Sequence, residues 1–412
     1  MNVLVLDGNQ NQAVASVRSL ASAGYTVFAG ESARGSKASV SKGRSKAGWS
    51  RACSGTLGYP SPQKHVDAFL ETILAFVRKH PGTLVLPMTE ATTLPISAHR
   101  ESLLAAGVRL VLPDHADLLR AFDKDHTTRL AASLGIAIPA TTLIATPQQA
   151  SDASRSVRYP VVLKPRSSEE ITPSGNIRSA GRPRYARDSA EFDEAYRDLS
   201  RRASSVLLQE FVPGEGMGYF ALMHHGELRA EFAHRRIRDV YPTGSGSAVR
   251  ISVDPDPEIR RASLAILSAL RWNGVAMVEY RKEPGQAAVF MEVNGRFWHS
   301  LALACYAGAD FPALLANMAE NGDVEPSLAE RSMDYRRDVR CRWLLGDARH
   351  LAEVWKGPPV GYPGAYPGRL RTLLDVLTPV PGTYHDLFQW NDPLPEVADW
   401  AYFAARMLRG RP

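Results

Sequence analysis

The sequence predicts a mixed protein of the α/β and α+β classes, with an open parallel sheet first and helices last. Over residues 1–115, short apolar strands alternate with helical stripes, which is the pattern of βαβ units. Two later apolar stretches, 275–280 and 287–293, are joined by KEPGQ and predict an antiparallel hairpin. From about residue 320 the chain is rich in Pro and Gly and then helical near its end. A length of 412 residues favours two or three domains.

The individual elements follow from apolar spacing and from start and stop signals. The first helix carries Val14, Val17 and Leu20 at helical spacing and ends at Gly24. A later helix starts at Asp256 as N-cap with Pro257 in its first turn. The expected strands are 3–6, 26–29, 84–86, 109–112, 161–164, 206–211, 275–280 and 287–293, and further helices are expected at 66–77 and 189–203.

Composition restricts the class of protein. Apolar residues make up 44% and charged residues 22%, and no apolar run approaches a membrane span. The N-terminus, MNVLVLDG, has no basic leader, and Cys53, Cys305 and Cys341 form no CxxC pair. We therefore expect a cytoplasmic protein with neither a disulfide framework nor a cysteine zinc site.

The net charge of +6 raises the question of a nucleic-acid partner. The basic residues are spread out, with concentrations at 34–51, 178–187 and 234–238 that lack the interleaved aromatic residues on which bases stack. We expect small anionic ligands and neither nucleic acid nor membrane. Segment 32–51 is expected to be a mobile surface loop, with contact to an acidic substrate as the alternative. A lone Gly8 without GxGxxG argues against a nicotinamide site.

The stretch VFMEVNGRFWHS, residues 289–300, carries a candidate site. Glu292, Asn294 and Arg296 occupy every second position, so they share one face of a strand, while Met291 and Val293 are expected in the core. Trp298 and His299 are expected to be packed residues.

Glu279 joins that face if the hairpin pairs residue 279 with residue 290. Two carboxylates beside an amide repel each other unless a cation lies between them. Mg²⁺ prefers such oxygen ligands, and Mn²⁺ is an alternative. From these residues alone, an exposed polar hairpin face explains the pattern equally well.

Two further stretches point to a phosphate-bearing ligand. Lys164 ends the apolar strand VVLKP, where a lysine is unfavourable unless it meets an anion. LLQEFVPGEG, at 207–216, opens from a strand into a turn that can offer backbone groups to an adenine edge. Glu215 then lies where an acid can bind ribose hydroxyls.

The order of these motifs resembles the ATP-grasp superfamily. The motifs are DK at 123–124, VVLKPR at 161–166, LLQEFVPGEG at 207–216, GVAMVEY at 274–280 and MEVNGRFW at 291–298. The sequence is most similar to the carboxylate–amine ligase branch, whose relatives include D-alanine–D-alanine ligase, biotin carboxylase and carbamoyl phosphate synthetase. The resemblance covers residues 115 to about 315.

The resemblance implies four parts. These are a Rossmann-like domain at 1–115, a small lobe with a phosphate flap at 116–205, a large lobe with the metal site at 206–320, and a helical C-terminal subdomain at 321–412. It also implies roles for the residues that match its motifs. Lys124 and Lys164 would bind the phosphates, and segment 166–184 would form the flap over them. The adenine would be bound by Gln209, Glu210 and Val212, and the ribose by Glu215. Mg²⁺ would be bound by Glu279, Glu292 and Asn294, and Arg296 would bind the transferred phosphoryl group.

The implied activity is ligation of a small-molecule carboxylate to an amine, with an acyl-phosphate intermediate and release of ADP and phosphate. Activation of bicarbonate and non-catalytic ATP binding are the alternatives. Arg238 and Arg250 are candidates to hold a substrate carboxylate, and the alternative is that they lie on a solvated strand edge. Lys164, Arg296 and Arg250 are the candidate catalytic residues. Glu90 is expected either to face the substrate or to cap a helix. A homodimer is the default expectation for such an enzyme.

Overall fold

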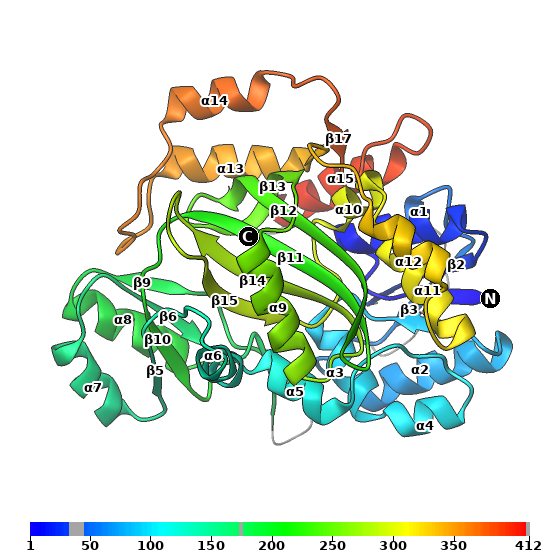
Figure 1. Ribbon diagram of the computed structural model, residues 1–412, viewed down its shortest axis with the longest axis horizontal. Helices are drawn as coiled ribbons and strands as arrows, with labels where there is room; N and C mark the ends of the chain where they lie inside the picture. The colour runs from blue at the N-terminus through cyan, green and yellow to red at the C-terminus, as the bar shows by residue number, and fades with distance from the viewer. Residues whose placement is uncertain (33–44, 173–175, 409–412) are drawn as a thin grey trace.

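The computed structural model describes residues 1–32, 45–172 and 176–408. Its parallel sheet and its small antiparallel sheet lie at opposite ends of the long axis, with a large sheet between them (Figure 1). Residues 33–44 of the expected basic loop lie outside the described residues, and the role of that loop stays a prediction.

The N-terminal sheet is parallel throughout, as the alternating pattern predicts. Its strand order is β3-β2-β1-β4, and alternate residues of β1 face opposite helix layers because strand side chains alternate. Val3 and Val5 pack with α1, whereas Leu4 packs with α2. The elements are β1 (Asn2–Val5), α1 (Asn11–Ser22), β2 (Thr26–Ser32), β3 (Gly55–Tyr59), α2 (Val66–Lys79), β4 (Leu84–Leu86), α3 (Glu90–Ala98) and α4 (Arg100–Ala105).

One strand prediction for this sheet is wrong, and one strand of the sheet was not predicted. Residues 109–112 form no strand and contribute only a bridge between Leu84 and Arg109. Strand β3 was not expected, because its sequence GTLGY holds two glycines and lacks a clear strand signal. It pairs with β2 as the edge of the sheet.

The small sheet has the order β5-β10-β6-β9, with β10 antiparallel to both neighbours. Strand β10 therefore belongs to this sheet, although a boundary was expected just before it. Segment 166–184 contains the hairpin β7–β8, of which 173–175 lie outside the described residues. The elements are α5 (His115–Phe122), α6 (Lys124–Ser133), β5 (Thr141–Ile144), α7 (Pro147–Ser156), β6 (Val161–Pro165), β7 (Glu169–Ile171), β8 (Ile177–Ser179), β9 (Arg184–Ala186), α8 (Ser189–Ser200) and β10 (Val206–Glu210).

The large sheet has seven strands in the order β15-β14-β11-β12-β13-β16-β17. One face packs on α9, whose N-terminus is capped by Asp256 as predicted, and the other packs on α10 and α11. The elements are β11 (Glu215–His224), β12 (Glu227–Tyr241), β13 (Ser245–Ser252), α9 (Pro257–Ala269), β14 (Gly274–Lys282), β15 (Val289–Asn294), α10 (Leu301–Ala307), α11 (Phe311–Asn321), β16 (Arg340–Arg342) and β17 (Tyr384–His385).

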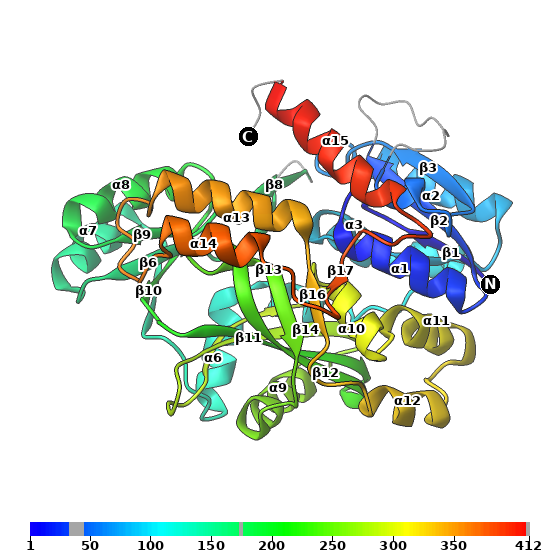
Figure 2. The ribbon, with the colours of Figure 1, turned by 90° about the horizontal axis from the view of Figure 1, so that it is seen from above.

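The last ninety residues do not form a sheet of their own, because β16 and β17 extend the large sheet. Helix α13 (Leu344–Lys356) packs on β12 and β13 of that sheet, and α14 (Arg369–Leu377) packs on α13. Helix α15 (Leu394–Leu408) reaches residues 47–49 of the N-terminal domain (Figure 2). Helix α12 (Pro326–Met333) follows α11.

None of the described helices is long and apolar enough by itself to cross a membrane. Helices α10 and α11 pass that test only as a pair, with an 84° bend between them. Both contribute buried residues to the main hydrophobic core.

Candidate active site

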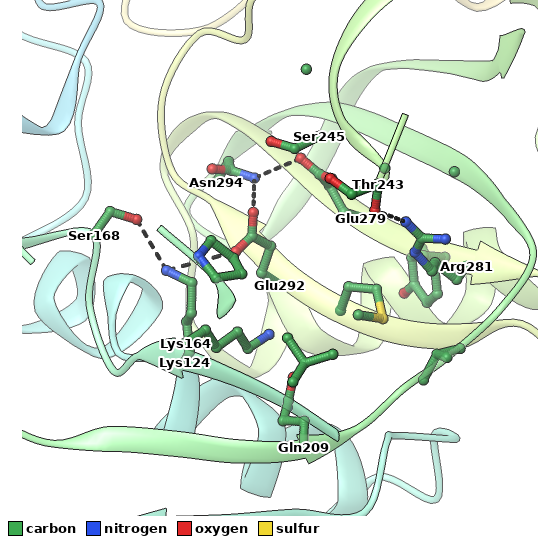
Figure 3. A pocket seen from close by; sticks show the side chains of 18 of the residues that line it. Lys124, Lys164, Ser168, Gln209, Thr243, Ser245, Glu279, Arg281, Glu292 and Asn294 are labelled. Carbon is green, nitrogen blue, oxygen red and sulfur yellow. Dashed lines mark hydrogen bonds and ion pairs between the residues drawn. The ribbon is translucent and has the colours of Figure 1, made fainter. Parts of the chain in front are cut away.

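A cavity of about 360 Å³ lies between the small and the large sheet (Figure 3). Strands β6 and β10 supply one wall, and β14, β15 and the β12–β13 connection supply the other. The cavity brings together nine of the predicted site residues, which are Lys124, Lys164, Gln209, Glu210, Val212, Glu279, Glu292, Asn294 and Arg296.

The two predicted metal-binding carboxylates face each other across the β14–β15 hairpin. Glu279 pairs directly with Glu292, and Tyr280 pairs with Phe290. The expected pairing of residue 279 with 290 is therefore wrong, because a β-bulge places Met291 between the two pairs. The bulge keeps both acids on one face, but it also turns Met291 to the cavity lining and not into the core.

Asn294 connects the two acids. Its Nδ2 donates to Oε1 of Glu279 at 3.1 Å and to Oε1 of Glu292 at 3.3 Å. A half-turn of the amide would present Oδ1 at the same point, so three oxygen-bearing side chains converge there. These donors fit the hard-oxygen preference of Mg²⁺. No cluster of three or more His, Cys, Asp or Glu with metal-binding geometry occurs in the described residues, since the third donor here is an amide.

Cationic groups surround this cluster. Arg236 Nη2 donates to Glu279 Oε2 at 2.6 Å, and Lys124 Nζ lies 3.6 Å from Glu292 Oε2. Arg296 Nη2 donates to Asn294 Oδ1 at 3.3 Å. Burial alone would raise the pKa of Glu292, but Lys124 and Lys164, with smaller help from Asn294 and Arg296, hold that pKa below its usual value. Glu292 is therefore ionised beside a cationic wall suited to phosphates.

Lys164 reaches the cavity from the small sheet. It is the fourth residue of β6, pairs with Leu207 of β10 and is 7% exposed. Burial lowers the pKa of its ammonium to about 8, although the charges of Glu292 and Glu279 oppose that fall. The sequence had predicted that a lysine at the end of this apolar strand would be unfavourable unless it meets an anion.

Lys124 is held in place by the start of α6. Asp123 caps this helix by accepting from the backbone N–H groups of Asp125 and His126. The same carboxylate takes a bidentate pair of hydrogen bonds from Arg166, which follows β6. Lys124 Nζ donates to Ser168 Oγ at 3.0 Å, so the lysine faces the segment expected to act as a flap.

The far end of the cavity is formed by the strand-to-turn segment after β10. Gln209 Nε2 donates to Thr141 Oγ1 at 2.9 Å, and Glu210 Oε1 accepts from the backbone N–H of Ala140 at 2.9 Å. The rings of Phe211 and Tyr362 pack edge to face with centroids 5.8 Å apart. The side chains are thus occupied locally, which suits the expectation that this segment reads its ligand chiefly through backbone atoms.

Neither a protein-family model nor a curated protein sequence matches this chain significantly. Solved structures do match. The biotin carboxylase domain dimer of Hydrogenobacter thermophilus 2-oxoglutarate carboxylase, in complex with MgADP, ADP and bicarbonate, is 15% identical, with a TM-score of 0.60 over 82% of this chain and 73% of that one. The L-amino acid ligase of Bacillus licheniformis is 16% identical, with a TM-score of 0.58 over 82% and 78%.

N5-carboxyaminoimidazole ribonucleotide synthetase from Thermus thermophilus is also 16% identical, with a TM-score of 0.56 over 82% of this chain and 81% of that one. The chain has the ATP-grasp fold. At such identities the likeness shows the fold alone. The roles of individual residues in this ATP-grasp chain remain predictions.

Four predicted residues do not line the cavity of this ATP-grasp fold. Glu215 is exposed at the start of β11 and pairs with Arg235 at 3.3 Å. Arg238 pairs with Asp347 at 2.5 Å, and the fully buried Arg250 pairs with Asp386. The acids that hold these arginines come from the C-terminal residues, which the sequence alone could not place. We therefore withdraw Arg238 and Arg250 as substrate ligands and Arg250 as a catalytic residue.

Glu90 has a different position from either expectation. It is the first residue of α3, and the N-cap position before it is occupied by Thr89. Its Oε1 lies 3.8 Å from Arg296 Nη2, so it connects the N-terminal sheet to the site through that arginine. Glu90 is buried and does not line the cavity.

Arg236 is a site residue that sequence reasoning missed. It starts on β12 and must cross β11 to reach Glu279 on β14. Gly216 on β11 leaves that path open, because a Cβ there would lie 2.9 Å from Arg236 Cδ. Gly218 leaves room in the same way for His234, whose Nε2 would lie 2.8 Å from an added Cβ. Alternate glycines in a strand signal such a close approach, and the run GMGY carried that signal.

Proposed function

We propose that this chain is an ATP- and Mg²⁺-dependent ligase that activates a carboxylate as an acyl phosphate and couples it to an amine, releasing ADP and phosphate. The observation that carries the proposal is the convergence of Glu279, Glu292 and Asn294 with the cations Lys124 and Lys164 on one cavity. Phosphoryl transfer depends on positioned charges more than on covalent chemistry with the enzyme. The charged side chains that line this cavity supply such charges.

Each step balances without an enzyme nucleophile. A carboxylate oxygen of the acid attacks the γ-phosphorus of ATP, and the bond to the leaving ADP oxygen breaks. The amine nitrogen then attacks the acyl carbon, loses a proton and expels phosphate. Held by Glu279, Glu292 and Asn294, Mg²⁺ would neutralise phosphate charge.

The chain's own cations support the charge that moves during these steps. Lys164 and Lys124 face the cavity from β6 and α6 and can bind phosphate oxygens. Arg296 is positioned by Asn294 and Glu90, where it can stabilise the transferred phosphoryl group and the acyl phosphate. Lys164 from the small sheet, Lys124 from α6 and Arg296 from the segment after β15 would thus surround the phosphates.

Water must be kept from the acyl phosphate. Segment 166–184 is suited to this task, because Ser168 takes a hydrogen bond from Lys124 and the backbone N–H of Ile177 donates to Gln63 at 3.2 Å. Movement of this hairpin over bound phosphates stays a prediction.

The proposal is tested by ADP release in the presence of Mg²⁺ and a panel of amino acids, offered as acids and as amines. We expect release that needs both an acid and an amine, and transfer of ¹⁸O from the labelled carboxylate to phosphate. Glu292→Gln should lower kcat by about 100-fold or more, since it removes a charge from the cluster. Glu283→Gln, in the exposed turn of the same hairpin, is the matched control and should keep full activity.

Other outcomes would select the alternatives. AMP with pyrophosphate would contradict acyl-phosphate chemistry. ADP release that needs bicarbonate in place of an organic acid would favour carboxylase-like activation. ATP binding without turnover on any panel member would favour a non-catalytic role. The homodimer, the cytoplasmic location and the lack of nucleic-acid and membrane partners stay predictions.

A further inference from the structure

The connection between α13 and α14, residues 357–368, lies beside β9 of the small sheet (Figure 2). We call it the tyrosine segment, because its sequence GPPVGYPGAYPG carries Tyr362 and Tyr366. The Tyr362 ring meets the rings of Tyr185 on β9 and Phe211 after β10 edge to face, with their centroids 5.1 and 5.8 Å from its own. The interplanar angles of 84° and 87° are an arrangement that aromatic pairs favour. A segment outside the ATP-grasp motifs is thus packed against the small sheet.

The two rings that Tyr362 contacts belong to the cavity. Tyr185 and Phe211 line it, whereas Tyr362 does not. Phe211 also lies between Glu210 and Val212, in the stretch expected to bind the base of the nucleotide. The centroids of the Tyr185 and Phe211 rings are themselves 6.3 Å apart. Tyr362 therefore contacts both rings from outside the cavity, and any effect that it has on a bound ligand must pass through them.

Glycines let the tyrosine segment approach the small sheet closely. Gly361 has a φ of +77°, in the left-handed region, and an added Cβ would collide with the backbone oxygen of Tyr185. A Cβ on Gly364 would lie 2.6 Å from the Tyr362 hydroxyl oxygen and 3.1 Å from Phe211 Cζ. The segment is thus fitted to both the backbone and the rings of the small sheet.

The same contacts continue to the large sheet. The Tyr366 hydroxyl donates to the carbonyl oxygen of Glu353 on α13 at 3.0 Å, and α13 packs on β12 and β13. The Tyr185 hydroxyl donates to the carbonyl oxygen of Thr243, in the β12–β13 connection, at 3.1 Å. These contacts hold the part of the small sheet that carries Tyr185 in place relative to the large sheet.

We infer that Tyr362 is a positioning residue for the nucleotide base, which holds Tyr185 and Phe211 in place at the end of the cavity where the base would lie. This inference rests on the nucleotide site of the proposed function and gives a role to a segment beyond the ATP-grasp motifs. Rings that are fixed before binding lose less freedom when a ligand arrives, so removal of their support should weaken the base contacts. The acid cluster lies on β14 and β15, so the contribution of Mg²⁺ to binding should be retained.

Calorimetric titration of ADP into the full chain, once with Mg²⁺ and once with EDTA, tests the inference. For Tyr362→Ala we expect Kd for ADP to rise about 10-fold under both conditions, because two edge-to-face contacts are lost. The ratio of the two Kd values should stay within about twofold of the wild-type ratio, because effects at separate sites add. Tyr362→Phe retains the ring and should keep Kd within about twofold of the wild-type value.

Two glycine variants test the fit of the tyrosine segment without a change of any aromatic residue. Gly361→Ala should displace the segment from β9 and raise Kd for ADP by about fivefold or more, again with an unchanged Mg²⁺ ratio. Gly368→Ala, at the end of the same segment, has no atom within 4 Å of the added Cβ and is the matched control, so its Kd should equal that of the wild type. If Tyr362→Ala does not fold, Gly361→Ala decides the inference by the same two titrations.

Three results would overturn the inference. An unchanged Kd for ADP in Tyr362→Ala would show that the cavity-lining rings need no support. A loss of affinity together with loss of the Mg²⁺ effect would indicate general distortion of the cavity. A loss of equal size in Tyr362→Phe would exclude the ring as the cause.

Failure of this inference is distinct from failure of the proposed function. A chain that binds ADP in the expected pattern but ligates no acid to any amine would keep the role of Tyr362 and lose the ligase. An active ligase in which Tyr362→Ala binds ADP as the wild type does would keep the ligase and lose the role of Tyr362. Wild-type protein that binds no ADP would overturn both.

Discussion

Lys164 is the residue whose charge the fold controls most directly. It leaves an apolar strand and enters a cavity where Glu292 and Glu279 attract it and Lys124 repels it. Burial outweighs these charges and lowers its pKa to about 8, against 10.5 for an ordinary lysine. An anion that approaches this ammonium replaces the lost hydration, so the lysine is best explained by a ligand with phosphates.

Binding of ATP should weaken as pH rises through this value. Below pH 8 the ammonium is charged and attracts phosphates, whereas above pH 8 it loses its proton and the attraction is lost. We expect KM for ATP to rise about 10-fold between pH 7 and pH 9.5. Lys164→Arg keeps its charge over this range and should remove the inflection. A flat profile in the wild-type enzyme would contradict the role given to Lys164.

At this scale the sequence predicted which residues meet but not how they meet. Alternation along VFMEVNGRFW placed Glu292, Asn294 and Arg296 on one face, because strand periodicity is a local property. The bulge at Met291 escaped prediction because it depends on pairing with a second strand. Arg250 was misjudged for a related reason, since its partner Asp386 lies far along the chain.

Among the elements, β11 has an indirect but decisive role. Its Gly216 contributes only backbone to the path by which Arg236 reaches Glu279 from β12. The guanidinium also lies 3.8 Å from Asp239, so it is held between two acids. The strand thereby keeps Glu279 oriented toward Glu292 and Asn294.

Gly216→Ala should disturb the metal cluster more than the fold. The new Cβ would lie 2.9 Å from Cδ of Arg236 and should displace the guanidinium from Glu279. We expect a stability loss of only about 1 kcal/mol, together with a severalfold higher Mg²⁺ requirement for ADP release. Gly368→Ala has no atom within 4 Å of the added Cβ and serves as control. An unchanged Mg²⁺ requirement in Gly216→Ala would refute this account of β11.

Elements with strong local signals were predicted, and those defined by distant partners were not. The cap and apolar stripe of α9 and the hairpin β14–β15 are confirmed. Strand β10 has an apolar sequence that says nothing about its neighbours, so its membership of the small sheet could not be foreseen. Strands β16 and β17 are too short to give a periodic signal.

At the scale of the whole molecule, the C-terminal residues tie the sheets together through buried ion pairs. Asp386 binds Arg250 of the large sheet and accepts from Asn11 of the N-terminal domain. Asp399 of α15 lies 3.0 Å from Lys46. These contacts join three regions of the chain that line or flank one cavity, and they could not be inferred from any single segment.

Asp386→Ala should therefore destabilise the molecule as a whole. It would leave the Arg250 guanidinium buried and unpaired, and loss of one partner of a buried pair costs about 3–5 kcal/mol. The urea midpoint of unfolding should fall accordingly. Asp375→Ala removes the partner of an exposed pair on α14, 3.9 Å apart, and should change the midpoint little. Equal effects of the two substitutions would contradict the structural role of Asp386.

The central claim is that Glu279, Glu292 and Asn294 hold a magnesium–nucleotide complex against Lys124 and Lys164. Calorimetric titration of ADP tests it without knowledge of the substrates. We predict that wild-type protein and Glu283→Gln bind ADP at least 10-fold more tightly with Mg²⁺ than with EDTA, and that Glu292→Gln loses this difference. ADP binding that is indifferent to Mg²⁺ in the wild-type protein, or a Mg²⁺ effect that survives in Glu292→Gln, would contradict the account.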